Sequence, residues 1–101
     1  MQFLVLTSRD MEQFSLADYT PELIEAEAQR VRQLLMEGTI RQIWRRGDLP
    51  GACILLEAAN EVEARSAIST LPLAQRGMLK IAVLTNLIPY PGFGPRTPQG
   101  L

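Results

Sequence analysis

The order in which apolar runs and amphipathic segments follow one another constrains the fold most. Four short apolar runs are typical of strands: residues 2–8, 39–46, 52–58 and 77–88. Two amphipathic segments have the apolar spacing of helices: residues 20–38 and 60–72. The order strand, helix, strand, strand, helix, strand predicts an α+β, ferredoxin-like fold with a four-stranded antiparallel sheet.

Both helices have marked ends. Thr20 can cap the first helix, Pro21 suits its first turn, and Gly38 ends it. Asn60 and Glu63 form a capping-box signature at the start of the second helix. Helical spacing predicts a buried stripe on the first helix formed by Ile24, Ala28, Val31, Leu34 and Leu35. The second helix is predicted to end at Pro72 and to bury Ala64, Ala67, Ile68 and Leu71.

This plan leaves one face of the sheet without helices. The last two strands are apolar on both faces, so a second copy is the natural cover for the bare face. We therefore expect a homodimer, or a higher oligomer, in which two sheets form a dimeric α/β barrel. One domain is predicted over residues 1–89, followed by a Pro- and Gly-rich tail over residues 90–101.

The charge and the missing residue types exclude several function classes. The formal net charge is −1 and the predicted pI is about 5.4, which argues against non-specific nucleic-acid binding. Histidine is absent, which removes the commonest general base and most zinc sites, so we expect no metal. No signal peptide or membrane-spanning run is evident, and the expected location is cytoplasmic, without a membrane partner.

The segment 37–46, EGTIRQIWRR, contains the only tryptophan and three arginines. Strict strand alternation predicts Arg41 and Arg45 on one face, and Ile40 and Trp44 on the other. The two guanidinium groups could hold a substrate carboxylate, or they could form ion pairs with Glu57 on the next strand. Trp44 is interpreted either as a core or interface aromatic or as the wall of a pocket.

Two acids are candidates for proton transfer. Glu57 ends an apolar strand, and burial there would raise its pKa as a general base requires. The alternative is a salt bridge from Glu57 to Arg41 or Arg45. Glu37 ends a helix, where an anion is unfavourable by about 0.3–1 kcal/mol, so it serves either a partner arginine or a reaction.

A family resemblance rests on Glu37-Gly38-Thr39, Arg41 and Trp44-Arg45, followed by Leu71-Pro72-Leu73 at the corresponding spacing. With these residues the chain resembles the muconolactone isomerase-like family of dimeric α/β-barrel proteins. The resemblance implies a pocket for a small lactone or organic acid, proton transfer without metal or organic cofactor, and a role in aromatic-compound catabolism.

The resemblance leaves the site residues to be chosen by their chemistry. We predict Glu57 and Glu37 as catalytic candidates, and as substrate-binding candidates Arg41, Trp44, Arg45 and Tyr19. The predicted activity is a cofactor-free proton-transfer isomerase acting on a small lactone or organic acid. The alternative is a non-catalytic oligomeric module that binds a small ligand or a partner. A cofactor-free monooxygenase is disfavoured by the missing histidine.

Overall fold

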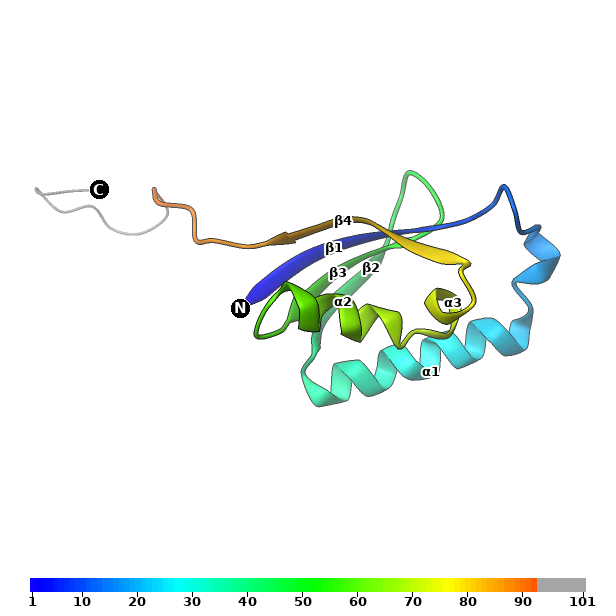
Figure 1. Cartoon of the computed structure of the whole chain (residues 1–101), viewed down its shortest axis with the longest axis horizontal. Coiled ribbons are helices and arrows are strands. Elements are labelled where there is room, and N and C mark those ends of the chain that lie inside the picture. The colour runs from blue at the N-terminus through cyan, green and yellow to red at the C-terminus, as the bar shows by residue number, and fades with distance from the viewer. Residues whose placement is uncertain (93–101) are drawn as a thin grey trace, which may run out of the picture.

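The computed structural model describes residues 1–92, and the predicted segment 93–101 of the tail lies outside the described residues. The elements in chain order are β1 (Gln2–Arg9), the 3-10 turn η1 (Leu16–Asp18), α1 (Pro21–Glu37), β2 (Ile40–Arg45), β3 (Ala52–Glu57), α2 (Glu61–Ser69), α3 (Pro72–Gln75) and β4 (Leu79–Asn86). The sheet order is β2-β3-β1-β4 with every neighbouring pair antiparallel (Figure 1). The predicted ferredoxin-like α+β fold is confirmed.

The predicted helix caps are present. The hydroxyl of Thr20 accepts a hydrogen bond from the Leu23 N–H at 3.2 Å, and the side chain of Asn60 accepts one from the Glu63 N–H at 2.9 Å. Gly38 caps α1 in the left-handed region with φ 83°. The helix α2 ends at Ser69 with Thr70 as its C-cap, before the predicted end at Pro72. Pro72 instead begins the short helix α3, which the sequence did not predict.

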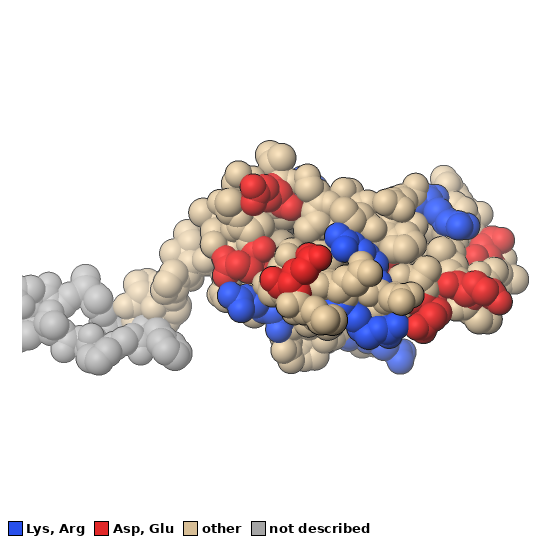
Figure 2. All heavy atoms as spheres, turned by 90° about the horizontal axis from the view of Figure 1, so that it is seen from below, with Lys and Arg blue, Asp and Glu red and all other residues tan. Residues whose placement is uncertain are grey.

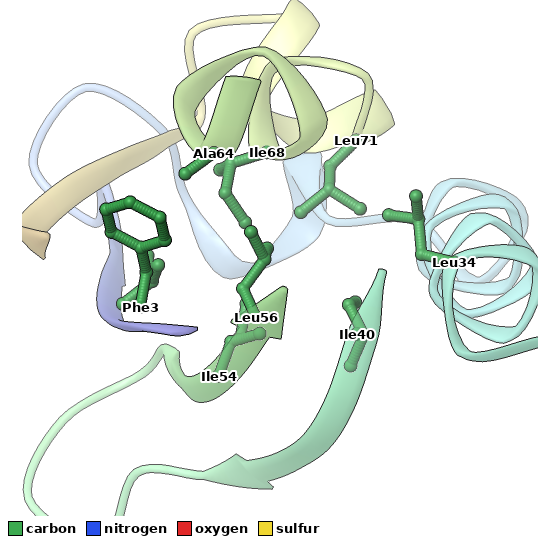
Figure 3. Packing of buried hydrophobic residues seen from close by; sticks show 9 residues of the cluster. Phe3, Leu34, Ile40, Ile54, Leu56, Ala64, Ile68 and Leu71 are labelled. Atoms are coloured by element: carbon green, nitrogen blue, oxygen red, sulfur yellow. The ribbon is translucent and has the colours of Figure 1, made fainter. Parts of the chain in front are cut away.

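The core lies between the sheet and the helices. Its fully packed cluster (Figure 3) consists of Phe3, Val5, Leu34, Ile40, Ile54, Leu56, Ala64, Ile68 and Leu71. A second cluster joins the start of α1 to α3 and contains Tyr19, Leu23, Leu73 and Met78. The short helix α3 contacts both α1 and α2 and so joins the two helices on this side of the sheet.

The buried stripe of α1 differs from the prediction at two positions. Leu35 was expected inside but is 39% exposed, whereas Leu23 is buried. Leu23 belongs to the second cluster, in which Leu73 and Met78 come from a distant segment of the chain, and helical spacing does not reveal such packing.

A bulge in β2 overturns the predicted strand alternation. Ile40 pairs with Leu56 and Gln42 with Leu55, so Arg41 is an extra residue in the strand. The phase then shifts by one, and Ile40 is buried with the core while Trp44 pairs with Cys53 on the opposite face. The prediction that Ile40 and Trp44 share a face is therefore wrong.

The same shift separates the two predicted arginines. Arg45 pairs with Ala52 in the strand register and belongs to the helix side of the sheet, whereas Arg41 occupies the bulge at the other end of β2. The prediction that they emerge together on one face fails for the same reason.

The helices cover one face of the sheet and leave the other bare (Figure 1). We call the bare side the outer face; by strand alternation it carries Leu4, Leu6, Trp44, Cys53, Leu55 and Val83. Trp44 is 50% and Val83 42% exposed. The helical side instead shows charges of both signs interspersed (Figure 2).

No helix within residues 1–92 is both long enough and apolar enough to cross a membrane.

Candidate functional site

A cavity of about 420 Å³ lies between α1 and the sheet, and we call it the inner cavity. Its apolar walls include Ile24, Ala28, Val31, Ile43, Ile54 and Leu71. The first three belong to the stripe that the sequence predicted as core. A volume of a few hundred Å³ with predominantly apolar walls suits a small organic ligand.

Charged side chains border this apolar space. Arg9, Glu27, Arg32 and Arg45 all contribute to its lining. Arg32 is already engaged, because its Nη2 lies 2.7 Å from a carboxylate oxygen of Glu25. The remaining groups are one carboxylate on α1 and two guanidinium groups from β1 and β2.

Glu27 is the acid of the inner cavity. It lies three residues after Ile24 and four before Val31, so helix geometry places it on the face that points at the sheet. Its side chain is half-buried, and Oε1 accepts a hydrogen bond from the N–H of Leu73, the second residue of α3, at 3.0 Å.

Burial raises the pKa of the Glu27 carboxyl above its usual range. The hydrogen bond from Leu73 and the positive charge of Arg9 act in the opposite direction, but burial is the larger effect. A carboxylate with a raised pKa in an apolar cavity has the properties of a general base.

The sequence prediction did not include Glu27. The sequence does contain a signal for Glu27: it is a single acid that falls, by helical spacing, within the apolar stripe of the first helix. Arg9 was also missed, because nothing in the sequence near the end of β1 distinguishes it from a solvated arginine.

Two predicted site residues adjoin the inner cavity. Arg45 and Trp44 both border it. For Trp44, strand alternation directs the indole to the outer face.

Tyr19 lies at an adjacent cavity and is buried. Its hydroxyl is 2.7 Å from the carbonyl oxygen of Asp10 and 3.0 Å from that of Met78, and the guanidinium carbon of Arg9 lies 5.4 Å from its ring centroid. Tyr19 therefore anchors the loop before α1 and supports Arg9.

The structure places the other predicted residues elsewhere. Arg41 and Glu57 form an ion pair at 3.7 Å, and the Met1 ammonium also donates to Glu57. Hydrogen bonding to this ammonium and the charge of Arg41 lower the pKa of Glu57, so Glu57 lacks the raised pKa that the general-base alternative requires. The other alternative, a salt bridge to Arg41, is the one that the structure shows. Glu37 is exposed at the end of α1 and borders, with Glu57, a shallow depression of about 330 Å³.

The predicted residues thus fall into separate places. Glu37 is also far from the acid of the inner cavity, because Glu27, which was not predicted, lies ten positions earlier on the same helix, or roughly 15 Å along its axis. Arg41, Trp44 and Glu57 do not converge on one cavity. Within residues 1–92, no group of three or more acidic or cysteine side chains is placed to hold a metal ion.

The fold and the site define a small ferredoxin-like α+β protein with a small-molecule cavity between its sheet and its long helix. Residues 1–91 match the family described as muconolactone delta-isomerase, and the chain belongs to this family. No curated protein matches the sequence.

Solved structures agree with this assignment at the level of the fold. The crystal structure of muconolactone isomerase at 3.3 Å resolution is similar with a TM-score of 0.72 and 22% identity, over 91% of this chain and 93% of that one. The 5-chloro-2-hydroxyhydroquinone dehydrochlorinase of Burkholderia phenoliruptrix AC1100, in complex with 2,5-dihydroxybenzoquinone, has a TM-score of 0.63 and 18% identity, over 91% and 96%.

Proposed function

We propose that the protein is an isomerase-like enzyme that moves a proton within a small lactone or organic acid bound in the inner cavity. The observation that carries the proposal is Glu27, an acid with a raised pKa that faces an apolar cavity in a muconolactone delta-isomerase family member. An aqueous intracellular compartment and a catabolic route for aromatic compounds are the expected setting.

The proposed step uses groups of the protein alone. The Glu27 carboxylate takes a proton from a carbon next to the substrate carbonyl, and the electron pair of that C–H bond moves into an enolate as the double bond shifts. The same carboxyl then returns the proton to a different carbon of the substrate. The charges of Arg9 and Arg45 at the cavity rim favour the anionic substrate and the enolate.

The names of the similar structures are consistent with this chemistry. A lactone double-bond isomerisation and a loss of hydrogen chloride both include removal of a proton from the substrate. A carboxylate base in an apolar cavity that can hold a ring suits either reaction. Of the two, we propose the isomerisation.

Proton transfer to carbon is tested by solvent exchange. Incubation of the protein with unsaturated five-membered lactone acids in D2O is expected to introduce deuterium at carbon, detected by proton NMR. Saturable binding of these acids without any exchange above the protein-free rate would contradict the enzyme and favour the non-catalytic binding module.

We also propose that a second copy covers the outer face. The apolar side chains there, including Leu4, Leu55 and Val83, form a continuous surface on the bare side of the sheet. Pairing two such faces would remove this apolar area from water, as a small domain with a modest core requires.

Val83→Glu is therefore expected to convert the dimer to a monomer, because the proposed interface would then bury a carboxylate without a partner. Sedimentation velocity measures the change in mass, and the emission of Trp44 should shift to longer wavelength as the indole becomes wet. Val62→Glu on α2, where valine is 73% exposed, is the matched control. Equal masses for V83E, V62E and the parent protein would contradict a dimer through this face.

A further inference from the structure

A second cavity of about 590 Å³ adjoins the inner cavity, and we call it the vestibule. Its lining includes Arg9, Tyr19, Arg45, Arg46, Asp48 and Pro50. Arg9, Arg45 and Gly51 line both cavities, so the two spaces meet at these residues. A ligand in the inner cavity that carries an arm could extend past the two arginines into the vestibule.

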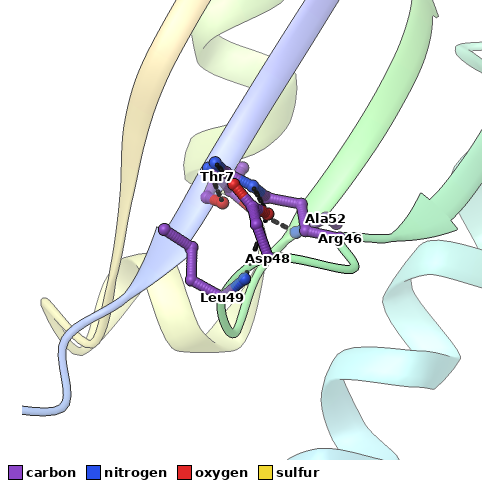
Figure 4. Close-up of polar contacts among 5 residues, drawn as sticks. All are labelled: Thr7, Arg46, Asp48, Leu49 and Ala52. Atoms are coloured by element: carbon purple, nitrogen blue, oxygen red, sulfur yellow. Dashed lines mark hydrogen bonds and ion pairs between the residues drawn. The ribbon is translucent and has the colours of Figure 1, made fainter.

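Asp48 neutralises one of the three vestibule arginines. Its carboxylate accepts from Arg46 Nε at 3.0 Å and from Nη2 at 2.7 Å, the bidentate geometry of a strong ion pair. Arg46 Nη1 also donates to the carbonyl oxygen of Thr7 at 3.3 Å (Figure 4). These contacts hold the Arg46 guanidinium against β1, and its side chain is only 14% exposed.

Arg9 and Arg45 differ from Arg46 in this respect. Neither forms an ion pair with a residue in the range 1–92. Arg9 is supported over the ring of Tyr19, which is itself fixed through its hydroxyl. The boundary between the cavities therefore carries two guanidinium groups without an ion-pair partner in the described part of the chain, and Glu27 is the nearby acid that the charge of Arg9 affects. The third guanidinium group, that of Arg46, is paired with Asp48.

We propose that the vestibule is a carboxylate-binding subsite whose charge is set by Asp48. Arg9 and Arg45 hold the single carboxylate of an arm attached to the ring in the inner cavity. Asp48 keeps Arg46 from adding a further charge, and it thereby disfavours arms that carry two carboxylates. This inference deepens the proposed function by naming the part of the substrate that Arg9 and Arg45 recognise. It rests on the proposed function in one respect only, which is that the ring of the substrate lies in the inner cavity.

Two non-reactive probes test the subsite by isothermal titration calorimetry. 3-Phenylpropionate has a ring and a one-carboxylate arm, and benzylmalonate has the same ring and arm with a second carboxylate. Arg45→Met is expected to weaken 3-phenylpropionate binding about tenfold or more, since it removes a charge-assisted contact. Arg9→Met should act in the same direction, and Arg65→Met, at an exposed ion pair on α2, is the charge-matched control.

Asp48→Asn is the discriminating variant, because asparagine keeps the size of the side chain and its acceptor for the Leu49 N–H. The parent protein should prefer 3-phenylpropionate, and D48N should shift the preference about fivefold or more towards benzylmalonate. R45M binding equal to that of R65M, or an unchanged preference in D48N, would overturn the subsite. Because the probes do not react, this result is independent of deuterium exchange: the subsite can fail while exchange persists, and exchange can fail while the binding pattern persists.

Discussion

Glu27→Gln is expected to lower the rate of proton transfer by about 100- to 10,000-fold, the usual contribution of a positioned general base. Glutamine keeps the shape of the side chain and can accept the hydrogen bond from the Leu73 N–H, but it cannot take up a proton. Binding of 3-phenylpropionate should change little, so the loss should appear in kcat. Deuterium incorporation into the lactone acid, followed by NMR, provides the measurement.

Two further variants separate this assignment from the sequence-based predictions. Glu57→Gln and Glu37→Gln test the acids that the sequence indicated, and we expect both to retain exchange because neither lines the inner cavity. Glu22→Gln, at an exposed position of the same helix, controls for the change in charge. A loss of exchange in E57Q with retention in E27Q would return the catalytic role to Glu57.

Thermal unfolding of E27Q separates a loss of catalysis from a loss of folding. The folded state raises the pKa of Glu27, so it holds the proton more tightly than the unfolded chain does. Above the pKa of Glu27 in the folded protein, the charged carboxylate lowers the free energy of unfolding. Below the pKa of an exposed glutamate, Glu27 is protonated in both states and this destabilisation is absent. E27Q should therefore unfold at a higher temperature than the parent at neutral pH, with the difference shrinking as the pH falls.

Gly51→Ala is expected to destabilise the protein by about 1–3 kcal/mol or more, as overpacking of a close contact does. A Cβ atom at Gly51 would lie 2.0 Å from the carbonyl oxygen of Thr7. Thr7 cannot move away easily, because it is buried and its hydroxyl accepts from the Ala52 N–H at 3.0 Å. The hairpin would have to separate from β1, which also opens both cavities.

Gly47→Ala, in the same hairpin, is the matched control. A Cβ there meets no atom within 4 Å, and the residue has no positive φ. Thermal unfolding should show a Tm for G51A lower by at least about 4 °C, since 1 kcal/mol corresponds to roughly 4–8 °C in a small domain. Equal Tm values for the two alanine variants would contradict the close packing of the hairpin on β1.

Local signals were sufficient to predict the order of elements and the helix caps. Thr20, Gly38 and Asn60 act through neighbours only a few residues away, and their capping roles can be read from the sequence. The family resemblance rested on residues 37–45 and 71–73, which lie within the matched range 1–91. The fold was therefore largely predictable.

The site was less predictable because it depends on contacts between distant segments. The bulge at Arg41 is a property of the pairing between β2 and β3, and alternation within β2 alone cannot show it. The Glu27 carboxylate accepts its hydrogen bond from Leu73, 46 positions away, and helical spacing around Glu27 cannot show this partner. Arg9 and Arg45 become neighbours of one cavity only after β1 and β2 are placed in the sheet.

The central claim is that the ligand lies between α1 and the sheet with its reacting group at Glu27. A crystal structure of the complex with 2,5-dihydroxybenzoquinone, the compound held by the similar dehydrochlorinase, tests this most directly. We expect the ring in the inner cavity, one oxygen within hydrogen-bonding distance of the Glu27 carboxyl, and another facing Arg9 and Arg45. A ligand bound instead at the Arg41–Glu57 ion pair, with the inner cavity left empty, would contradict the account.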